Sequence, residues 1–241
     1  MRVRVLGLPP AASELQFIDF SRVQEARKRK VETLPDEPLI AGFDVSGGGA
    51  AWNVIRFRRG LDGRSIPPIR IPGEKGRDRS VLIGVAAEVL RESRPEKKVA
   101  AMFVDSAFGA PIVERLRTLG FDNVHEVSFG GPSPDYHDAN WRAYMWRQMK
   151  DWLAKGGIPD EEQLALQICL PGYHINRSNK LVLESKSDLA QRGEASPDDA
   201  DALALTFAQH VAPIEPSKQE PVLCDIFVGG GFSGLGGGWM R

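Results

Sequence analysis

The order of the predicted strands and helices constrains the fold of this chain more than any other feature of the sequence. Apolar residues first follow a strand-like pattern in three consecutive segments, at 39–45, 52–58 and 66–71. Helical and strand patterns then alternate, with helices at 78–91 and 110–119 and strands at 99–104 and 123–127. Strands joined by short turns pair antiparallel, whereas strands joined through a helix pair parallel. The sequence therefore predicts an α/β domain with a mixed sheet.

This β-β-β-α-β-α-β order, followed by a late helix, is that of the ribonuclease H-like fold. In that fold a mixed central sheet, an antiparallel meander continued by parallel strands, is flanked by helices. Pro67 and Pro68 predict that the third strand is short or lies at an edge. Three later segments complete the pattern: a helix at 138–154, a hairpin at 173–183 and a final helix at 196–208. We expect Ser196 to cap the final helix, with Pro197 at its first position.

The length of 241 residues suffices for one domain with its own core. We expect this domain at 39–212, preceded by a leader segment at 1–38 and followed by a flexible Gly-rich tail at 213–241. The leader contains a strand candidate at 2–6 and a helix that we expect Ser21 to cap. No signal peptide or membrane-spanning stretch is apparent, and Cys169 and Cys224 cannot form a disulfide framework. These features predict a soluble protein of a reducing compartment, the cytoplasm.

Aspartates end two of the predicted strands and begin the last helix. Asp44 ends the apolar run 39–43 of the first strand, just before the glycines at 47–49, and Asp105 follows the strand at 99–104. Asp198 and Asp201 are three residues apart, so they share one face of the first helical turn. If the first and fourth strands are parallel neighbours, Asp44 and Asp105 lie at the same edge of the sheet. The last helix can then bring Asp198 over them.

Clustered carboxylates repel one another, and the sequence shows no evident Lys or Arg partner for them. Hard divalent cations, which prefer oxygen ligands, would neutralise the repulsion. Two such ions about 3.5–4 Å apart can activate a water and stabilise the leaving oxygen of a phosphodiester. Each acid also has a structural explanation: Asp44 as a turn residue, Asp105 as a helix cap and Asp198 as an acid favoured by the helix dipole. Their coincidence in one topology favours a catalytic site.

Several segments carry a family resemblance in their order and spacing. They are 42–49 (GFDVSGGG), 103–105 (FVD), 140–146 (NWRAYMW), 183–186 (LESK) and 196–203 (SPDDADAL). Together they resemble the nuclease domain of tailed-phage large terminase subunits, from about residue 2 to about residue 210. The chain differs from that family at Ala50 and Ala51, where a polar residue is common. It also lacks the G-x-x-x-x-G-K-[ST] loop of the terminase ATPase, so we expect no motor activity.

The resemblance implies a metal-dependent endonuclease at 39–212 that cuts double-stranded viral DNA during genome packaging, in the host cytoplasm. It implies that Asp44, Asp105 and Asp198 are catalytic and hold two divalent cations, Mg²⁺ or Mn²⁺, and that Asp201 is a further ligand. As partners it implies a terminase ATPase domain, the small terminase subunit and the portal. The segment at 1–38 would then be a connector to the motor.

The distribution of charge, rather than its sum, suggests where DNA binds. The chain carries 31 Lys and Arg against 32 Asp and Glu, a net charge of −1. Residues 56–79, however, contain eight basic and three acidic residues, a net charge of +5. Such a hairpin and loop can contact phosphates without reading bases, although an arginine-rich edge also deters strand pairing. The candidate nucleic-acid-binding residues are Arg56, Arg58, Arg59, Arg77 and Arg79.

Other functions remain open at this point. A Holliday-junction resolvase of the same fold would prefer branched DNA, and a DNA-binding or packaging-assembly module would bind without cutting. An actin-like ATPase also places glycines after a strand Asp, but it needs a second Asp-Gly loop that Asp105-Ser106-Ala107 does not supply. The aromatic residues of the helix at 138–154 are expected in the core, and no histidine is assigned to catalysis.

Overall fold

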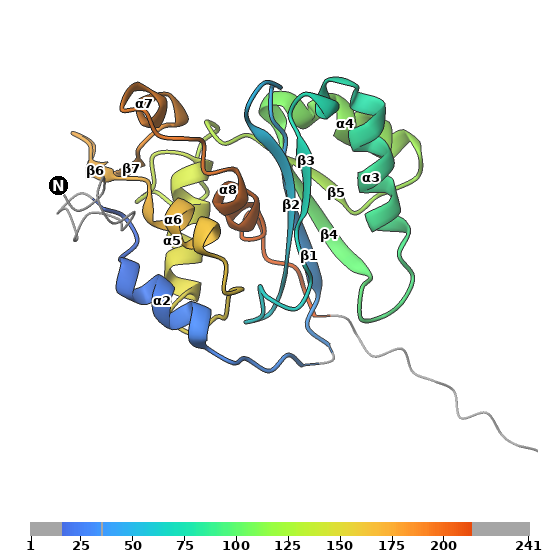
Figure 1. The fold of residues 1–241 in the computed structure, drawn as a ribbon, viewed down its shortest axis with the longest axis horizontal. Coiled ribbons are helices and arrows are strands. Elements are labelled where there is room, and N and C mark those ends of the chain that lie inside the picture. The colour runs from blue at the N-terminus through green and yellow to red at the C-terminus, as the bar shows by residue number, and fades with distance from the viewer. Residues whose placement is uncertain (1–15, 35, 214–241) are drawn as a thin grey trace, which may run out of the picture.

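The structure is a computed structural model that describes residues 16–34 and 36–213 (Figure 1). The strand expected at 2–6 and almost all of the tail expected at 213–241 lie outside the described residues. Within the described part, no helix combines the length and the apolar character needed to cross a membrane.

A five-stranded mixed sheet forms the centre of the fold, in the order β3-β2-β1-β4-β5. The strands are β1 (Leu39–Asp44), β2 (Trp52–Arg59), β3 (Ile69–Pro72), β4 (Val99–Asp105) and β5 (Val124–Val127). β2 pairs antiparallel with β1 and β3, whereas β4 pairs parallel with β1 and β5. The predicted ribonuclease H-like fold class is thereby confirmed. The third strand is a short edge strand that begins directly after Pro68, as the prolines predicted.

Helices cover both faces of this sheet (Figure 1). On one face lie α3 (Arg79–Arg91) and α4 (Ser106–Thr118), and a short 3-10 helix, η1 (Lys75–Arg77), precedes α3. On the other face lie α2 (Phe20–Lys28), α5 (Trp141–Trp152), α6 (Glu162–Cys169) and α8 (Asp198–Leu205). The predicted hairpin is present as β6 (Tyr173–Ile175) and β7 (Leu181–Leu183), and α7 (Lys186–Gln191) follows it.

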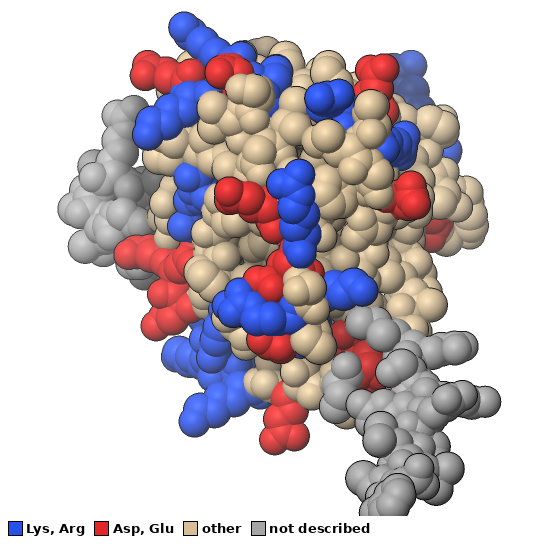
Figure 2. Space-filling view, turned by 90° about the vertical axis from the view of Figure 1, so that its right-hand side faces the viewer, with Lys and Arg blue, Asp and Glu red and all other residues tan. Residues whose placement is uncertain are grey.

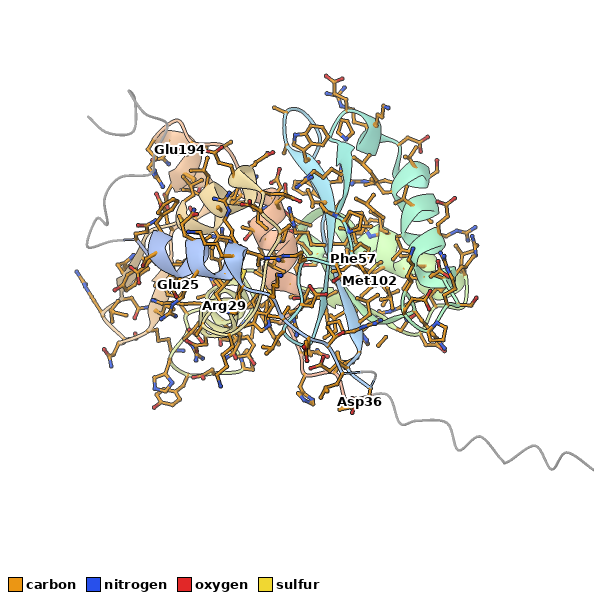
Figure 3. The ribbon with its side chains drawn as sticks, turned by 60° about the horizontal axis from the view of Figure 1, so that its bottom comes forward. Glu25, Arg29, Asp36, Phe57, Met102 and Glu194 are labelled. Atoms are coloured by element: carbon orange, nitrogen blue, oxygen red, sulfur yellow. The ribbon has the colours of Figure 1, made fainter. Side chains whose placement is uncertain are left out.

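Each face of the sheet buries its own hydrophobic cluster. Ala41 of β1 is in register with Phe57 of β2 and Met102 of β4. These three side chains belong to the cluster under α3 and α4, and Figure 3 shows Phe57 and Met102 close together in the middle of the sheet. The opposite cluster contains Trp146 of α5, which is fully buried. Burial on both faces explains why β1 is an unbroken apolar run.

Gly42 allows α8 to pack directly against β1. A Cβ atom at Gly42 would lie 2.0 Å from the carbonyl oxygen of Ala202 and 2.8 Å from the Cβ of Leu205. Any side chain here would push α8 away from the sheet. The close approach matters for the site, because it keeps the first turn of α8 next to the end of β1.

The structure decides which apolar row of α3 faces the core. The row of Val81, Val85 and Val89 lies at the margin, where Val81 is 40% exposed, whereas Leu82, Ala86 and Leu90 are buried. Both rows are apolar and lie one position apart on the helix, about 100° around its axis. Contact with the sheet therefore decides between them.

Three helix starts also differ from the predictions. α2 begins at Phe20, so Ser21 lies inside the helix rather than at its cap. α4 begins at Ser106, four residues before the predicted start at 110, with Asp105 as N-cap and Pro111 inside the helix. α8 begins at Asp198, and Ser196 precedes the N-cap position. The backbone N–H groups of Asp199 and Ala200 instead donate to the side-chain oxygen of Gln167 on α6, a partner supplied by tertiary packing.

Candidate functional site

The predicted aspartates lie where β1, β4 and α8 come together. Asp44 is the last residue of β1, Asp105 the last of β4 and Asp198 the first of α8, and all three side chains are buried. Asp105 and Asp198 line a cavity of about 440 Å³. Asp44 lies close enough to Asp198 and Asp201 for their negative charges to raise its pKa. The topology thus brings all four predicted acids to one edge of the sheet.

The sequence analysis missed a lysine among these carboxylates. The Nζ atom of Lys186 lies 2.9 Å from Asp44 Oδ2, 3.3 Å from Asp201 Oδ2 and 3.9 Å from Asp198 Oδ1. Lys186 is the first residue of α7, at the top of Figure 1. A capping box between Ser185 and Asp188 fixes the start of α7. That S-x-x-D pattern is the sequence signal that marks the helix start, although it does not show what Lys186 contacts.

A second cation, Arg142 of α5, holds Asp201. Arg142 Nε donates to Asp201 Oδ1 at 3.0 Å, and the indole nitrogen of Trp146 donates to the same oxygen at 2.7 Å. Burial opposes ionisation of Asp201, but Arg142 and Lys186 hold the pKa of its carboxyl below the ordinary value. Asp201 is therefore a fixed negative charge beneath the site. The expectation that no Lys or Arg partners these acids was wrong, because both partners come from segments distant in sequence.

The other three acids are harder to ionise. Burial, together with the charges of Asp201 and Asp198, raises the pKa of Asp44 to about 7, although Lys186 opposes the shift. Burial also raises the pKa values of Asp105 and Asp198. Buried carboxyls with raised pKa values indicate a place where added positive charge would be bound favourably.

The carboxylate oxygens of this cluster are the type of ligand that a hard divalent cation prefers. Among the described residues, no donor lies within hydrogen-bond distance of the buried Oδ1 atom of Asp44. An unpaired buried carboxylate oxygen is costly unless a cation or proton satisfies it. In the arrangement shown, no three His, Cys, Asp or Glu side chains of residues 16–34 and 36–213 converge closely enough to hold an ion. The Lys186 ammonium lies among the carboxylates instead.

Asp199, the acid next to Asp198, belongs to a separate ion network. Its carboxylate accepts from Arg56 Nε at 2.8 Å and from Arg70 Nε at 2.9 Å. Both arginines also pair with Glu161, at 2.7 and 2.6 Å. The carboxylate of Asp199 is thus paired with two arginines and does not line the cavity. Arg56, a predicted DNA-binding residue, is only 2% exposed. Its guanidinium is buried against Asp199 and is not accessible to DNA.

Two more of the candidate DNA-binding arginines have internal partners. Arg58 donates to the hydroxyl and carbonyl oxygens of Thr206, and burial lowers its pKa to about 10. Arg59 donates to the backbone carbonyl of Glu96 at 2.8 Å. By contrast, Arg77 is exposed and its side chain lies beside Gly48, in the loop that follows Asp44. On the face formed by α3 and α4, Figure 2 shows basic and acidic side chains interspersed.

The sequence matches no protein-family model and no curated protein. Solved structures do match. The nuclease domain of the large terminase subunit gp2 of bacterial virus Sf6 is 16% identical, has a TM-score of 0.59 and aligns over 81% of this chain and 99% of that one. The chain has the fold of a large terminase nuclease domain. The large terminase nuclease from thermophilic phage G20c is also 16% identical, with a TM-score of 0.51, over 80% of this chain and 98% of that one.

A longer protein shares the fold as well. The HK97 bacteriophage large terminase is 10% identical with a TM-score of 0.55, and the match covers 80% of this chain but 43% of the HK97 chain. Related structures of the Sf6 domain contain calcium or manganese, one of them together with beta-thujaplicinol, and a G20c structure contains magnesium. These similarities confirm the fold that the resemblance implied.

Proposed function

We propose that this chain is a divalent-metal-dependent endonuclease that cleaves double-stranded viral DNA during genome packaging. The observation that carries the proposal is the meeting of Asp44, Asp105 and Asp198 at one edge of a terminase nuclease fold. All three have pKa values raised by burial, and one carboxylate oxygen of Asp44 has no donor among the described residues.

We assign Asp44, Asp105 and Asp198 as the groups that would hold two divalent cations, Mg²⁺ or Mn²⁺. When bound, such ions supply an activated water and charge stabilisation of the leaving oxygen of a phosphodiester. Asp201 is proposed as a further ligand, and it would need to give up its contact with Lys186 to become one. The metals found in the Sf6 and G20c domains support divalent-metal use here.

Lys186 is proposed to balance the charge of the cluster while no metal is bound. Its ammonium lies within 4 Å of three carboxylates. A cation entering between Asp44 and Asp198 meets this positive charge, so Lys186 must move aside or release its partners. Its position on the first turn of a short helix makes such a movement possible without change to the sheet.

The partners follow from the same fold. We propose that the substrate is double-stranded DNA, and that the chain acts with a terminase ATPase domain, a small terminase subunit and a portal in the host cytoplasm. The HK97 match supports a role as one part of a larger terminase, since this chain covers 43% of that protein. The nuclease domain itself is proposed at 39–212.

Cleavage of supercoiled plasmid with Mg²⁺, Mn²⁺, Ca²⁺ or EDTA tests the proposal. We expect nicking and linearisation with Mn²⁺ or Mg²⁺ and none with EDTA. Asp44→Ala, Asp105→Ala and Asp198→Ala should each abolish cleavage, whereas Asp122→Ala, on an exposed turn before β5, should cut like the parent. If any of the three site variants cuts as well as the parent, its assignment fails.

The same assay separates the remaining alternatives. Faster cutting of a four-way junction than of linear duplex would indicate a Holliday-junction resolvase instead. Metal-independent binding with no cleavage in any metal would indicate a DNA-binding or packaging-assembly module.

A further inference from the structure

The basic segment at 56–79 divides into an internal part and an external part. Its first five basic residues donate hydrogen bonds to their own chain: Arg56, Arg58, Arg59, Arg64 and Arg70. Lys75 and Arg77, on η1, are exposed, and no ion pair or side-chain hydrogen bond engages either of them in the described part of the chain. Within residues 16–34 and 36–213, Lys75 and Arg77 are therefore the exposed basic residues of this segment that have no partner, and the exposed acids Glu74 and Asp78 flank them. Arg79, the eighth basic residue, is half-buried at the start of α3, and its Nη1 atom has no hydrogen-bond partner among the described residues.

Close backbone packing fixes η1 against the loop that follows Asp44. A Cβ atom at Gly73 would lie 2.3 Å from the carbonyl oxygen of Ala51 and 2.8 Å from that of Gly49. A Cβ atom at Gly76 would lie 2.3 Å from the side-chain nitrogen of Asn53. No other residue fits at these two positions without separating the segments. This close packing holds η1 against the loop that follows Asp44.

Asn53 connects this packing to the end of β1. Its buried side chain accepts a hydrogen bond from the backbone N–H of Ser46 at 3.0 Å and donates to the carbonyl of Ile71 at 3.3 Å. Ser46 is two residues beyond Asp44. One amide side chain therefore ties the exit of β1 to β3, the strand that leads into η1.

The glycine loop beside Arg77 is open. Gly48 and Gly49 have φ angles of +103° and +73°, and nothing lies within 4 Å of a Cβ position at Gly49. The Cγ and Nε atoms of Arg77 each lie 3.6 Å from the Cβ position at Gly48. The backbone N–H of Gly48 donates to the Ser46 hydroxyl at 3.3 Å, so the open part of the loop is at Gly49. A loop without side chains lets an anion approach the backbone closely, and a guanidinium beside it can pair with phosphate in a bidentate manner.

We propose that the loop at 47–49 together with Arg77 and Lys75 forms a phosphate-binding ledge. It would contact the DNA backbone next to the phosphodiester that the aspartates cleave. The proposal rests on the proposed nuclease function, because that function supplies the DNA. Arg77 would bind one strand through its phosphates and so contribute to DNA affinity. It reads no bases, since phosphate contacts carry no sequence information.

The test compares Arg77→Ala and Lys75→Ala with Arg115→Ala, a variant of an exposed arginine on the last turn of α4, at the end opposite to Asp105. Binding of a fluorescein-labelled linear duplex is followed by anisotropy in Ca²⁺ over a range of salt concentrations. Each neutralised phosphate contributes about −0.9 to the slope of log affinity against log salt. Between about 50 and about 200 mM salt, the parent's advantage over Arg77→Ala should therefore shrink about 3.5-fold. Arg115→Ala should keep the slope of the parent.

Cleavage kinetics in Mn²⁺ supply the second measurement. We expect Arg77→Ala to raise the DNA concentration at which the rate is half-maximal. The single-turnover rate at saturating DNA should stay within about 2-fold of the parent, because the lost contact binds the substrate and the transition state equally. An unchanged salt slope and affinity in Arg77→Ala overturns the proposal, even if the parent cuts DNA. If the parent binds with this salt dependence but cuts nothing in any metal, the ledge stands and the nuclease function fails.

Discussion

Replacing Asp44 with Asn should remove a loss of stability that the metal-free parent undergoes as the pH rises, and it should destroy activity. Burial and the neighbouring carboxylates raise the pKa of Asp44 from 3.8 to about 7. A raised carboxyl pKa means that the native state holds the proton more tightly than the unfolded state does. The stability that this proton confers is complete below the ordinary value of 3.8 and is lost as the pH rises towards about 7.

The size of the effect follows from this shift. Each pH unit between the two pKa values costs about 1.4 kcal/mol of unfolding free energy. From about pH 5 to about pH 8, ionisation of Asp44 should lower the unfolding free energy of the parent by about 3 kcal/mol. Asp44→Asn has no ionisable group at this position, so its unfolding free energy does not fall for this reason. Since about 1 kcal/mol shifts the melting temperature of a domain of this size by about 2–4 °C, the difference is measurable.

Thermal unfolding in EDTA at the two pH values, followed by circular dichroism, measures this difference. We expect the Asp44→Asn melting temperature to gain on that of the parent as the pH rises. Asp122→Asn, a change at an exposed aspartate, should stay parallel to the parent. The reasoning is refuted if the melting temperature of Asp44→Asn does not gain on that of the parent between about pH 5 and about pH 8.

Three further predictions address the scaffold of the site. Arg142→Ala leaves the buried carboxylate of Asp201 without its main partner and should lower the free energy of unfolding in urea by about 3–5 kcal/mol. Arg142→Lys should recover only part of this free energy. A cost below about 1 kcal/mol contradicts the assigned pairing. Gly42→Ala places a Cβ atom against the carbonyl of Ala202 and should lower the melting temperature, whereas an unchanged value would mean that α8 is not held at this distance. Lys186→Ala removes the ammonium from among the carboxylates, so titration calorimetry should show tighter Mn²⁺ binding than in the parent. Weaker binding would show that Lys186 helps to hold the ion rather than competing with it.

Much of the fold was predictable because its signals are local. Strand periods, the prolines before β3 and the apolar run of β4 reflect the chemistry of neighbouring residues, and their order leaves few topologies. The same holds for the position of Asp44, Asp105 and Asp198 at the ends of elements. These acids could be chosen from the sequence because parallel strands end at the same edge of a sheet.

Contacts between distant segments could not be read in this way. Lys186 and Arg142 reach the acids from α7 and α5. The sequence shows no positive partner near the acids because these two residues are distant from most of them along the chain. Arg56 looked like a surface residue of a basic hairpin, yet it is buried against Asp199, more than a hundred residues away in the chain. Whether a charged side chain faces water or a partner depends on the packing of α6 and α8 over the sheet. The sequence alone thus determined the order of the elements and the position of the acids at their ends, because both depend on local pattern. Only the tertiary structure decided which charged side chains are paired or buried and which stay exposed, because burial and pairing depend on segments that meet after folding.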